Sequence, residues 1–163
     1  MPRGVQTIVL FLIEITYHMP SLRQFLLSKG YCRSRLFPTV TNHLEMKAKI
    51  NGVEGSFILD TGASSSCIDF SHADLFGLLQ EDSEVLAAGA GATGMETKLS
   101  RNNSLKIQKW QYKKLDIVLF DMSHVNTALI AHNAAPVHGI LGADVLNAGK
   151  GIIDYQYNCL YLK

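Results

Sequence analysis

The chain of 163 residues contains few cysteines, and their positions do not favour shared chemistry. Cys32, Cys67 and Cys159 are odd in number and far apart, and no C-x-x-C pair occurs. This spacing argues against a disulfide framework and against a structural zinc site. The six histidines are scattered, without the H-E-x-x-H spacing of a helical metal site. The sequence therefore predicts no metal ion and no cofactor.

The chain also lacks an excess of charge of either sign. Fifteen Lys and Arg residues face fourteen Asp and Glu residues, which gives a formal net charge of +1. Domains that bind nucleic acid usually carry a clear basic excess, so we do not expect a nucleic-acid partner. Hydrophobic residues make up 47% of the chain, enough to bury a core, and the length corresponds to one domain.

No apolar run is long enough to cross a bilayer. The segment Val5–Ile15 is mostly apolar, but Gln6 and Glu14 interrupt it and no small-x-small cleavage site follows. We expect residues 1–18 to be a leader or an upstream extension, with Met19 as an alternative start, and no stable membrane insertion. The expected location is the cytoplasm, or the periplasm or exterior if residues 1–18 act as a signal.

A short helix is predicted near the N-terminus. Ser21–Gln24 has the capping-box pattern, and Gly30 is a typical stop signal. Leu22, Phe25 and Leu26 lie on one apolar face, with which we expect the helix to dock on the main body.

The strongest structural signal is a β-hairpin over residues 44–59. Apolar and charged residues alternate over Leu44–Ile50, as in a half-buried strand. Asn51-Gly52 follows, and this pair favours a type I′ turn because both positions need positive φ. The return strand, Val53–Leu59, ends in an apolar run.

The remaining segments predict a mainly β domain, barrel-like or sandwich-like, with few helices. Strands are expected over residues 31–37, closed by Pro38, and over 105–107, 115–120 and 137–141, with short helices over 125–131 and 143–146, and a closing hairpin that pairs 152–155 with 159–162.

The candidate catalytic residues lie directly after the hairpin, in the segment Asp60-Thr61-Gly62-Ala63-Ser64. The apolar strand before Asp60 would hold its carboxylate rigidly, and Gly62 would let backbone N–H groups approach that carboxylate. The Thr61 hydroxyl can donate and accept, so it can join one loop to another, and Ser64 can support the carboxylate from outside. Asp-Thr-Gly is also ordinary turn chemistry, but the apolar strand and the following Ala-Ser make that reading less favourable.

This motif resembles that of the retropepsin-like aspartic proteases, most of all their small bacterial members. A second block, Gly139–Leu146, supports the resemblance, which covers residues 43–163. It implies a closed, barrel-like acid protease fold with a short C-terminal helix, to which residues 19–42 add a helix and a strand. It also implies that Ile140, Leu141 and Gly142 pass beside the catalytic loop, and that peptides or proteins are the substrates.

The resemblance further implies two aspartates sharing one proton, whereas the chain has one Asp-Thr-Gly. Asp144, in the second block, lacks Thr and Gly neighbours. We therefore expect a homodimeric endopeptidase in which Asp60 of each subunit contributes one carboxylate. The alternative is a catalytically silent dimerisation or peptide-binding module on the same fold. The C-terminal hairpin could pair strands between subunits or complete an internal sheet.

Gly89–Gly94 matches the dinucleotide fingerprint G-x-G-x-x-G. No parallel β-α-β pattern surrounds it, so nucleotide binding is the weaker interpretation. In a protease, Gly89, Ala90, Gly91 and Gly94 would instead belong to a hairpin flap over the peptide, since glycine lets backbone groups reach a substrate main chain.

Overall fold

A computed structural model of the protein describes residues 19–83, 87–89 and 92–163. It contains three α-helices, one 3₁₀ helix and thirteen strands over these residues. Their bounds are α1 Leu22–Ser28, β1 Cys32–Arg35, β2 Phe37–Pro38, β3 Leu44–Ile50, β4 Val53–Leu59, β5 Cys67–Asp69, η1 Phe70–His72, β6 Glu81–Asp82, β7 Ala87–Gly89, β8 Ala92–Met95, β9 Lys98–Ile107, β10 Trp110–Phe120, α2 Ser123–Ala131, β11 Gly139–Leu141, α3 Ala143–Ala148, β12 Ile152–Asp154 and β13 Cys159–Leu162.

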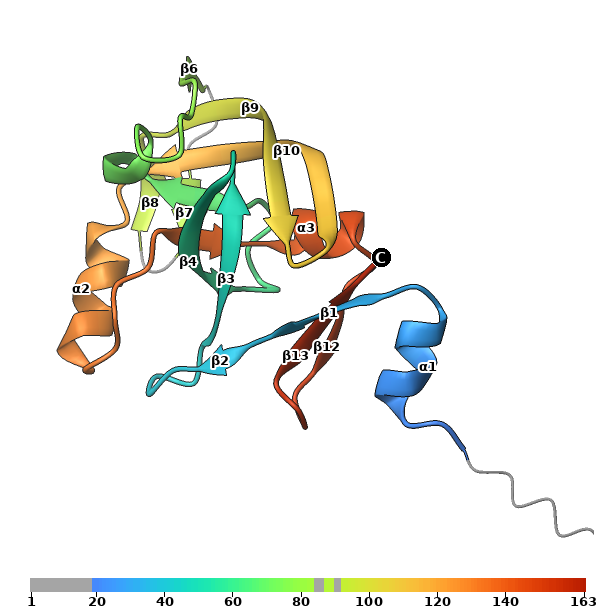
Figure 1. The fold of residues 1–163 in the computed structure, drawn as a ribbon. Helices are drawn as coiled ribbons and strands as arrows, with labels where there is room; N and C mark the ends of the chain where they lie inside the picture. Colours follow the sequence, from blue (N-terminus) through green and yellow to red (C-terminus); the bar gives the residue numbers. More distant parts are fainter. Residues whose placement is uncertain (1–18, 84–86, 90–91) are drawn as a thin grey trace, which may run out of the picture.

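Six strands form a closed barrel, as expected (Figure 1). Their order is β3-β4-β11-β5-β10-β9, and pairing of β9 with β3 closes the ring. The main hydrophobic core fills the barrel, with Phe57, Met46, Ile117 and Leu119 almost fully buried. The mainly β, barrel-like fold predicted from the sequence is confirmed.

The β3–β4 hairpin has the predicted turn and register. Asn51 and Gly52 both have positive φ, 49° and 88°. The two strands pair from Leu44 opposite Leu59 to Ile50 opposite Val53. Burial alternates along β3, while all residues from Gly55 to Leu59 are buried. The last residue of the hairpin, Leu59, is therefore part of the hydrophobic core inside the barrel.

Strand β11 is inserted between β4 and β5, although these two strands are neighbours in the sequence. It is parallel to β4, with Ile140 opposite Ile58, and antiparallel to β5. A side chain at Gly139 would place its Cβ 2.2 Å from the Cys67 carbonyl oxygen. Glycine is thus needed here because the backbones are close together.

A separate three-stranded sheet, β1-β13-β12, joins the two ends of the described chain. Strand β13 pairs with β1, with Arg35 opposite Cys159, and with β12, with Ile153 opposite Leu160. The predicted C-terminal hairpin is confirmed, and within this chain it completes an internal sheet. The predicted strand over residues 31–37 is divided, and Pro38 lies inside β2 rather than after the strand.

Helix α1 has the predicted capping box, in which the Ser21 side chain accepts from the Gln24 N–H. The predicted apolar face is wrong in part: Leu26 is buried against Tyr161 and Cys159, whereas Leu22 and Phe25 are about half exposed. The seven residues of α1 make only about two turns, and Leu26 is the residue of the helix that is buried. Among the described residues no helix combines the length and apolarity needed to cross a membrane.

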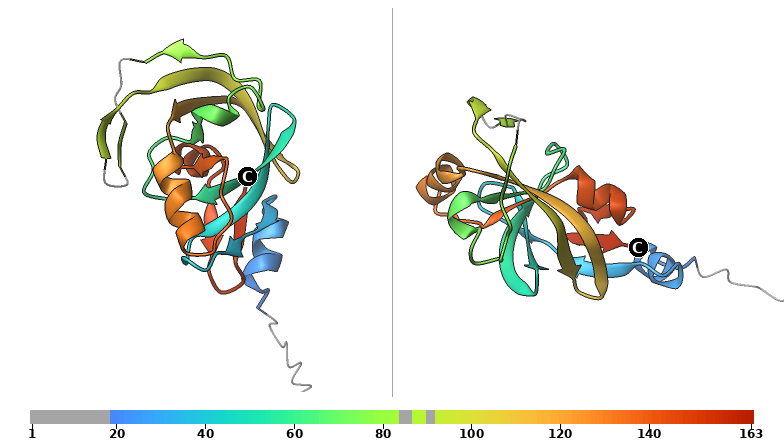
Figure 2. Two further views of the ribbon diagram at one scale, coloured as in Figure 1. Left: turned by 90° about the vertical axis from the view of Figure 1, so that its left-hand side faces the viewer. Right: turned by 90° about the horizontal axis from the view of Figure 1, so that it is seen from above.

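The described residues of the G-x-G-x-x-G segment belong to two paired antiparallel strands rather than to a β-α-β unit. Strands β7 and β8 form a two-stranded antiparallel sheet that projects from the barrel (Figure 2), with Gly89 opposite Ala92. Gly89 and Gly94 belong to these strands, whereas Ala90 and Gly91 lie outside the described residues. Strand β9, not a helix, follows β8, so the geometry of a dinucleotide fingerprint is absent from the described part of this segment.

Candidate active site

Asp60 is the first residue after the buried strand β4, and it is partly exposed. Its carboxylate is fixed by its own loop, because the Gly62 N–H donates to Asp60 Oδ1 at 2.8 Å. A Cβ at Gly62 would lie 3.2 Å from that oxygen, so glycine permits the close backbone approach that the sequence predicted. The result is an oriented carboxylate at the surface end of a rigid strand.

The second motif holds the backbone of the Asp60 loop, which comprises residues 60–66. The Asp60 N–H donates to the Leu141 carbonyl at 3.0 Å, and the Ala143 N–H donates to the Ala63 carbonyl at 2.8 Å. Gly142 lies between these contacts, and a Cβ there would approach the Ala63 carbonyl oxygen to 2.6 Å. Glycine is therefore required at position 142 because a side chain would not fit. Its backbone conformation is not the reason, because a φ of −100° is accessible to other residues.

Ser66 and Asp144 connect the end of the Asp60 loop to helix α3. Asp144 accepts from the Ser66 N–H at 2.8 Å, from the Ser66 hydroxyl at 2.7 Å and from the Val145 N–H at 2.8 Å. The Ser66 hydroxyl also accepts from the Gly142 N–H at 3.0 Å. Sequence reasoning missed this role of Ser66, although a small hydroxyl residue close to the motif was the available signal.

Two of the predicted support residues, Thr61 and Ser64, take no part through their side chains in the hydrogen bonds that the structure describes within the Asp60 loop. Thr61 and Ser64 are exposed, and neither side chain forms a hydrogen bond with the residues that the structure describes. In the second motif, Ile140 is half-buried and packs against the cluster of Ile58, Leu129 and Val137. Leu141, the next residue, belongs instead to the main core inside the barrel.

A hollow of about 240 Å³ lies beside Asp60. Thr61, Leu44 and His43 line it from the barrel, and Ile153 and Tyr155 line it from the C-terminal hairpin. Tyr155 is 71% exposed, unusual for a large aromatic residue. No sequence pattern indicated that the ends of β3 and β12 would meet at Asp60, because this contact depends on the tertiary arrangement of the two sheets.

Cys67 is buried directly behind the Asp60 loop. Burial raises the pKa of its thiol to about 12, and the nearby Asp144 and Asp60 carboxylates act in the same direction. The thiol is therefore protonated at neutral pH, as expected for a structural cysteine. No group of three or more His, Cys, Asp or Glu side chains suited to a metal ion occurs in the described part of the chain.

The closed barrel, the inserted strand and the aspartate loop are together the architecture of the retropepsin-like acid proteases. The sequence matches the family model described as aspartyl protease over residues 46–145, which is more than half of the chain. The chain belongs to the aspartyl protease family. No curated protein sequence matches it.

Solved structures share the fold at low sequence identity, and two of them serve as examples. A retropepsin-like aspartic protease from Rickettsia conorii is 18% identical, with a TM-score of 0.56, over 81% of this chain and 90% of that chain. The retroviral protease-like domain of Ddi1 from Leishmania major is 16% identical, with a TM-score of 0.51, over 74% of this chain and 88% of that one. At these identities the likeness concerns the fold alone.

Proposed function

We propose that the protein is a homodimeric aspartic endopeptidase in which Asp60 of each subunit supplies one catalytic carboxylate. The observation that carries the proposal is the Asp60 carboxylate, held by the Gly62 N–H at the rim of a hollow. Asp144 does not compete for this role, because three hydrogen bonds from Ser66 and Val145 hold its carboxylate. One chain thus offers half of a two-carboxylate site.

Two Asp60 carboxylates within hydrogen-bond distance would share one proton, because two like charges that close cannot both ionise. The ionised carboxylate would take a proton from water while the water oxygen bonds to the peptide carbonyl carbon. The protonated carboxyl would donate its proton to the carbonyl oxygen. Collapse of the tetrahedral intermediate would then break the C–N bond, with a proton passing to the leaving nitrogen.

The other predicted residues would serve this step around the two-fold axis. Thr61, exposed in the single chain, would bond to the partner's loop, and Ser64 would support the carboxylate from outside. The β7–β8 hairpin, with Gly89 and Gly94, would act as the flap over the peptide, together with Ala90 and Gly91 between its strands.

The decisive experiment combines a substitution with subunit mixing. Asp60→Asn should abolish cleavage of a peptide library at acidic and neutral pH while the dimer, measured by sedimentation, persists. Asp74→Asn, a change at an exposed aspartate away from the site, should leave activity within about twofold of wild type.

Mixing tests the shared site directly. When a large excess of Asp60→Asn protein exchanges subunits with wild type, most wild-type chains enter mixed dimers and the activity should fall nearly to zero. Activity that stays constant on mixing would show that one chain suffices. A dimer that cleaves no peptide, and that binds peptides equally well with and without the Asp60→Asn substitution, would instead identify a silent peptide-binding module.

A further inference from the structure

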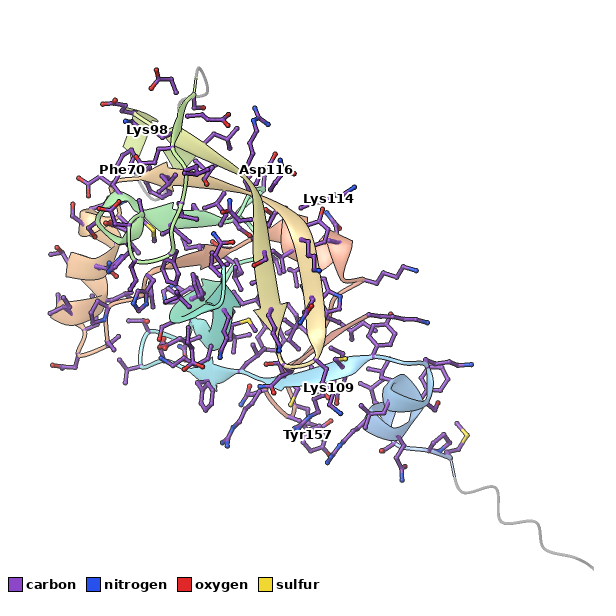
Figure 3. The ribbon with its side chains drawn as sticks, turned by 45° about the horizontal axis from the view of Figure 1, so that its top comes forward. Phe70, Lys98, Lys109, Lys114, Asp116 and Tyr157 are labelled. Carbon is purple, nitrogen blue, oxygen red and sulfur yellow. The ribbon has the colours of Figure 1, made fainter. Side chains whose placement is uncertain are left out.

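The β9–β10 hairpin carries a strong local excess of positive charge, although the whole chain has a net charge of only +1. Residues 97–115 contain no Asp or Glu. Their cations are Lys98, Arg101, Lys106, Lys109, Lys113 and Lys114. Lys109 and Lys114 lie on this long hairpin at the barrel's edge (Figure 3), and all four of its lysines from 106 onward are exposed.

Three lysines from three strands surround one hollow of about 220 Å³ on the outside of the barrel. Lys49 comes from β3, Lys106 from β9 and Lys113 from β10, and no carboxylate lines this lysine hollow. Lys49 lies directly opposite Lys106 in the β3–β9 ladder. Like charges in directly opposed positions destabilise a sheet, so this pairing lacks a structural reason.

Two other cations on the barrel lie close to carboxylates of the same chain. Arg101 forms ion pairs with Glu81 and Asp116, at 3.2 and 3.3 Å, and Lys47 lies 3.9 Å from Glu45. The lysines of the hollow form no ion pair with any residue that the structure describes, even though Glu54 is the β4 neighbour of Lys49. Their charges are thus available to a ligand.

We propose that the lysine hollow binds an acidic segment of the protein substrate, away from the bond that is cut. This inference rests on the proposed protease function. Gly52 lines the hollow and directly precedes β4, and Asp60 directly follows the same strand, eight positions later. At about 3.3 Å per residue the two sites are about 26 Å apart along β4. An extended peptide would therefore place its acidic residues about eight positions from the scissile bond.

The chemistry favours an acidic peptide over a nucleic acid. Proteins that bind single strands stack bases on exposed aromatic rings. The aromatic residues of this hairpin do not offer such a surface, because Trp110 is 9% exposed and its ring stacks on Tyr112 with centroids 6.1 Å apart. The ammonium group of a lysine is a compact point charge on a flexible side chain. Several lysines around a small hollow can therefore each bind a different carboxylate of an acidic peptide.

Binding is measured first without cleavage, by fluorescence anisotropy on the full-length Asp60→Asn protein. The probes are a labelled octaglutamate peptide, a neutral Gly-Ser peptide of the same length and a single-stranded oligonucleotide. Octaglutamate should bind more tightly than the neutral peptide, and the affinity should fall as salt rises from about 50 to 300 mM.

The triple change Lys49→Gln, Lys106→Gln and Lys113→Gln should weaken octaglutamate binding about tenfold, the sum of three surface ion pairs. A charge-matched control replaces Lys29, Lys98 and Lys150, which lie outside the hollow, by glutamine and should change binding less than twofold. Equal loss in both triple variants, or tighter binding of the oligonucleotide than of octaglutamate, would overturn the proposal.

Kinetics then separate this inference from the proposed function. In the active protein, a substrate with four glutamates beginning about eight residues from the cleaved bond should have a KM about tenfold lower than its glutamine counterpart, with kcat unchanged. Cleavage of both substrates with equal KM would refute the lysine hollow and leave the protease intact. Charge-dependent octaglutamate binding without any cleavage would retain the lysine hollow as an acidic-peptide site and refute the protease.

Discussion

Replacing Ser66 by alanine removes the side chain that connects the Asp60 loop to helix α3. The Ser66 hydroxyl donates to Asp144 Oδ1 at 2.7 Å and accepts from the Gly142 N–H at 3.0 Å. Ser66 is 1% exposed, so solvent does not easily replace either bond. The variant would keep the bond from the Ser66 N–H to Asp144 Oδ2, because this bond uses the backbone.

Two losses set the size of the effect. A hydrogen bond to a charged group contributes about 1.5–3 kcal/mol, and a buried N–H left without an acceptor costs about 1–3 kcal/mol. Because the remaining contacts to Asp144 limit the damage, we expect Ser66→Ala to lower the free energy of unfolding by about 2–4 kcal/mol. For a domain of this size that corresponds to a Tm lower by roughly 5–15 °C.

Urea denaturation followed by the fluorescence of Trp110, the single tryptophan, measures this change. Ser65→Ala is the matched control, because Ser65 is the exposed neighbour and its hydroxyl has no hydrogen-bond partner among the described residues. The control should shift the free energy by less than about 0.5 kcal/mol. If Ser66→Ala behaved like Ser65→Ala, the proposed connection between the Asp60 loop and α3 would be wrong.

Two further predictions concern titratable groups. Burial lowers the pKa of the His138 imidazole below its usual 6.5, and the neighbouring His72 and Lys47 act in the same direction, although Glu45 opposes them. His138 therefore takes up a proton more readily in the unfolded chain than in the folded one, so the free energy of unfolding should fall as the pH drops from 7 to 5. In the His138→Gln variant, the Tm measured by thermal unfolding should depend less steeply on pH over this range. A Tm that depends on pH as steeply in the variant as in the wild type would contradict this account. Because its pKa is raised to about 12, Cys67 should resist alkylation at pH 8 in the native protein, whereas the partly exposed Cys32 should react first, as read by peptide mass spectrometry. Labelling of Cys67 before Cys32 would show that the Asp60 loop opens readily.

Local signals predicted the parts of the fold whose contacts lie close in sequence. The alternation over Leu44–Ile50 and the Asn51-Gly52 turn specify the β3–β4 hairpin, because period and turn chemistry act on adjacent residues. The capping box at Ser21 likewise specifies where α1 begins. The same signals do not say what covers a helix, so the exposure of Leu22 and Phe25 was not predicted.

The candidate site was predictable in its motifs but not in its connections. The sequence indicated Asp60 and Gly142 as members of one site, and the structure joins their loops by backbone hydrogen bonds. The hollow at His43 and Tyr155 and the bridge from Ser66 to Asp144 depend on residues 78 to 112 positions apart. Such pairings arise from barrel closure and from the pairing of β1 with β13, which join segments far apart in the sequence and which no local pattern specifies.

The insertion of β11 between β4 and β5 has a consequence for how the protein is made. During synthesis the chain emerges from the N-terminus, so β4 and the Asp60 loop exist long before residues 139–145 leave the ribosome. Until then, the Asp60 N–H has no Leu141 carbonyl to bond and Ser66 has no Asp144. A nascent chain that ends before α3 would therefore hold an unformed loop, and the order of translation itself would delay the carboxylate's assembly until nearly the whole barrel is present.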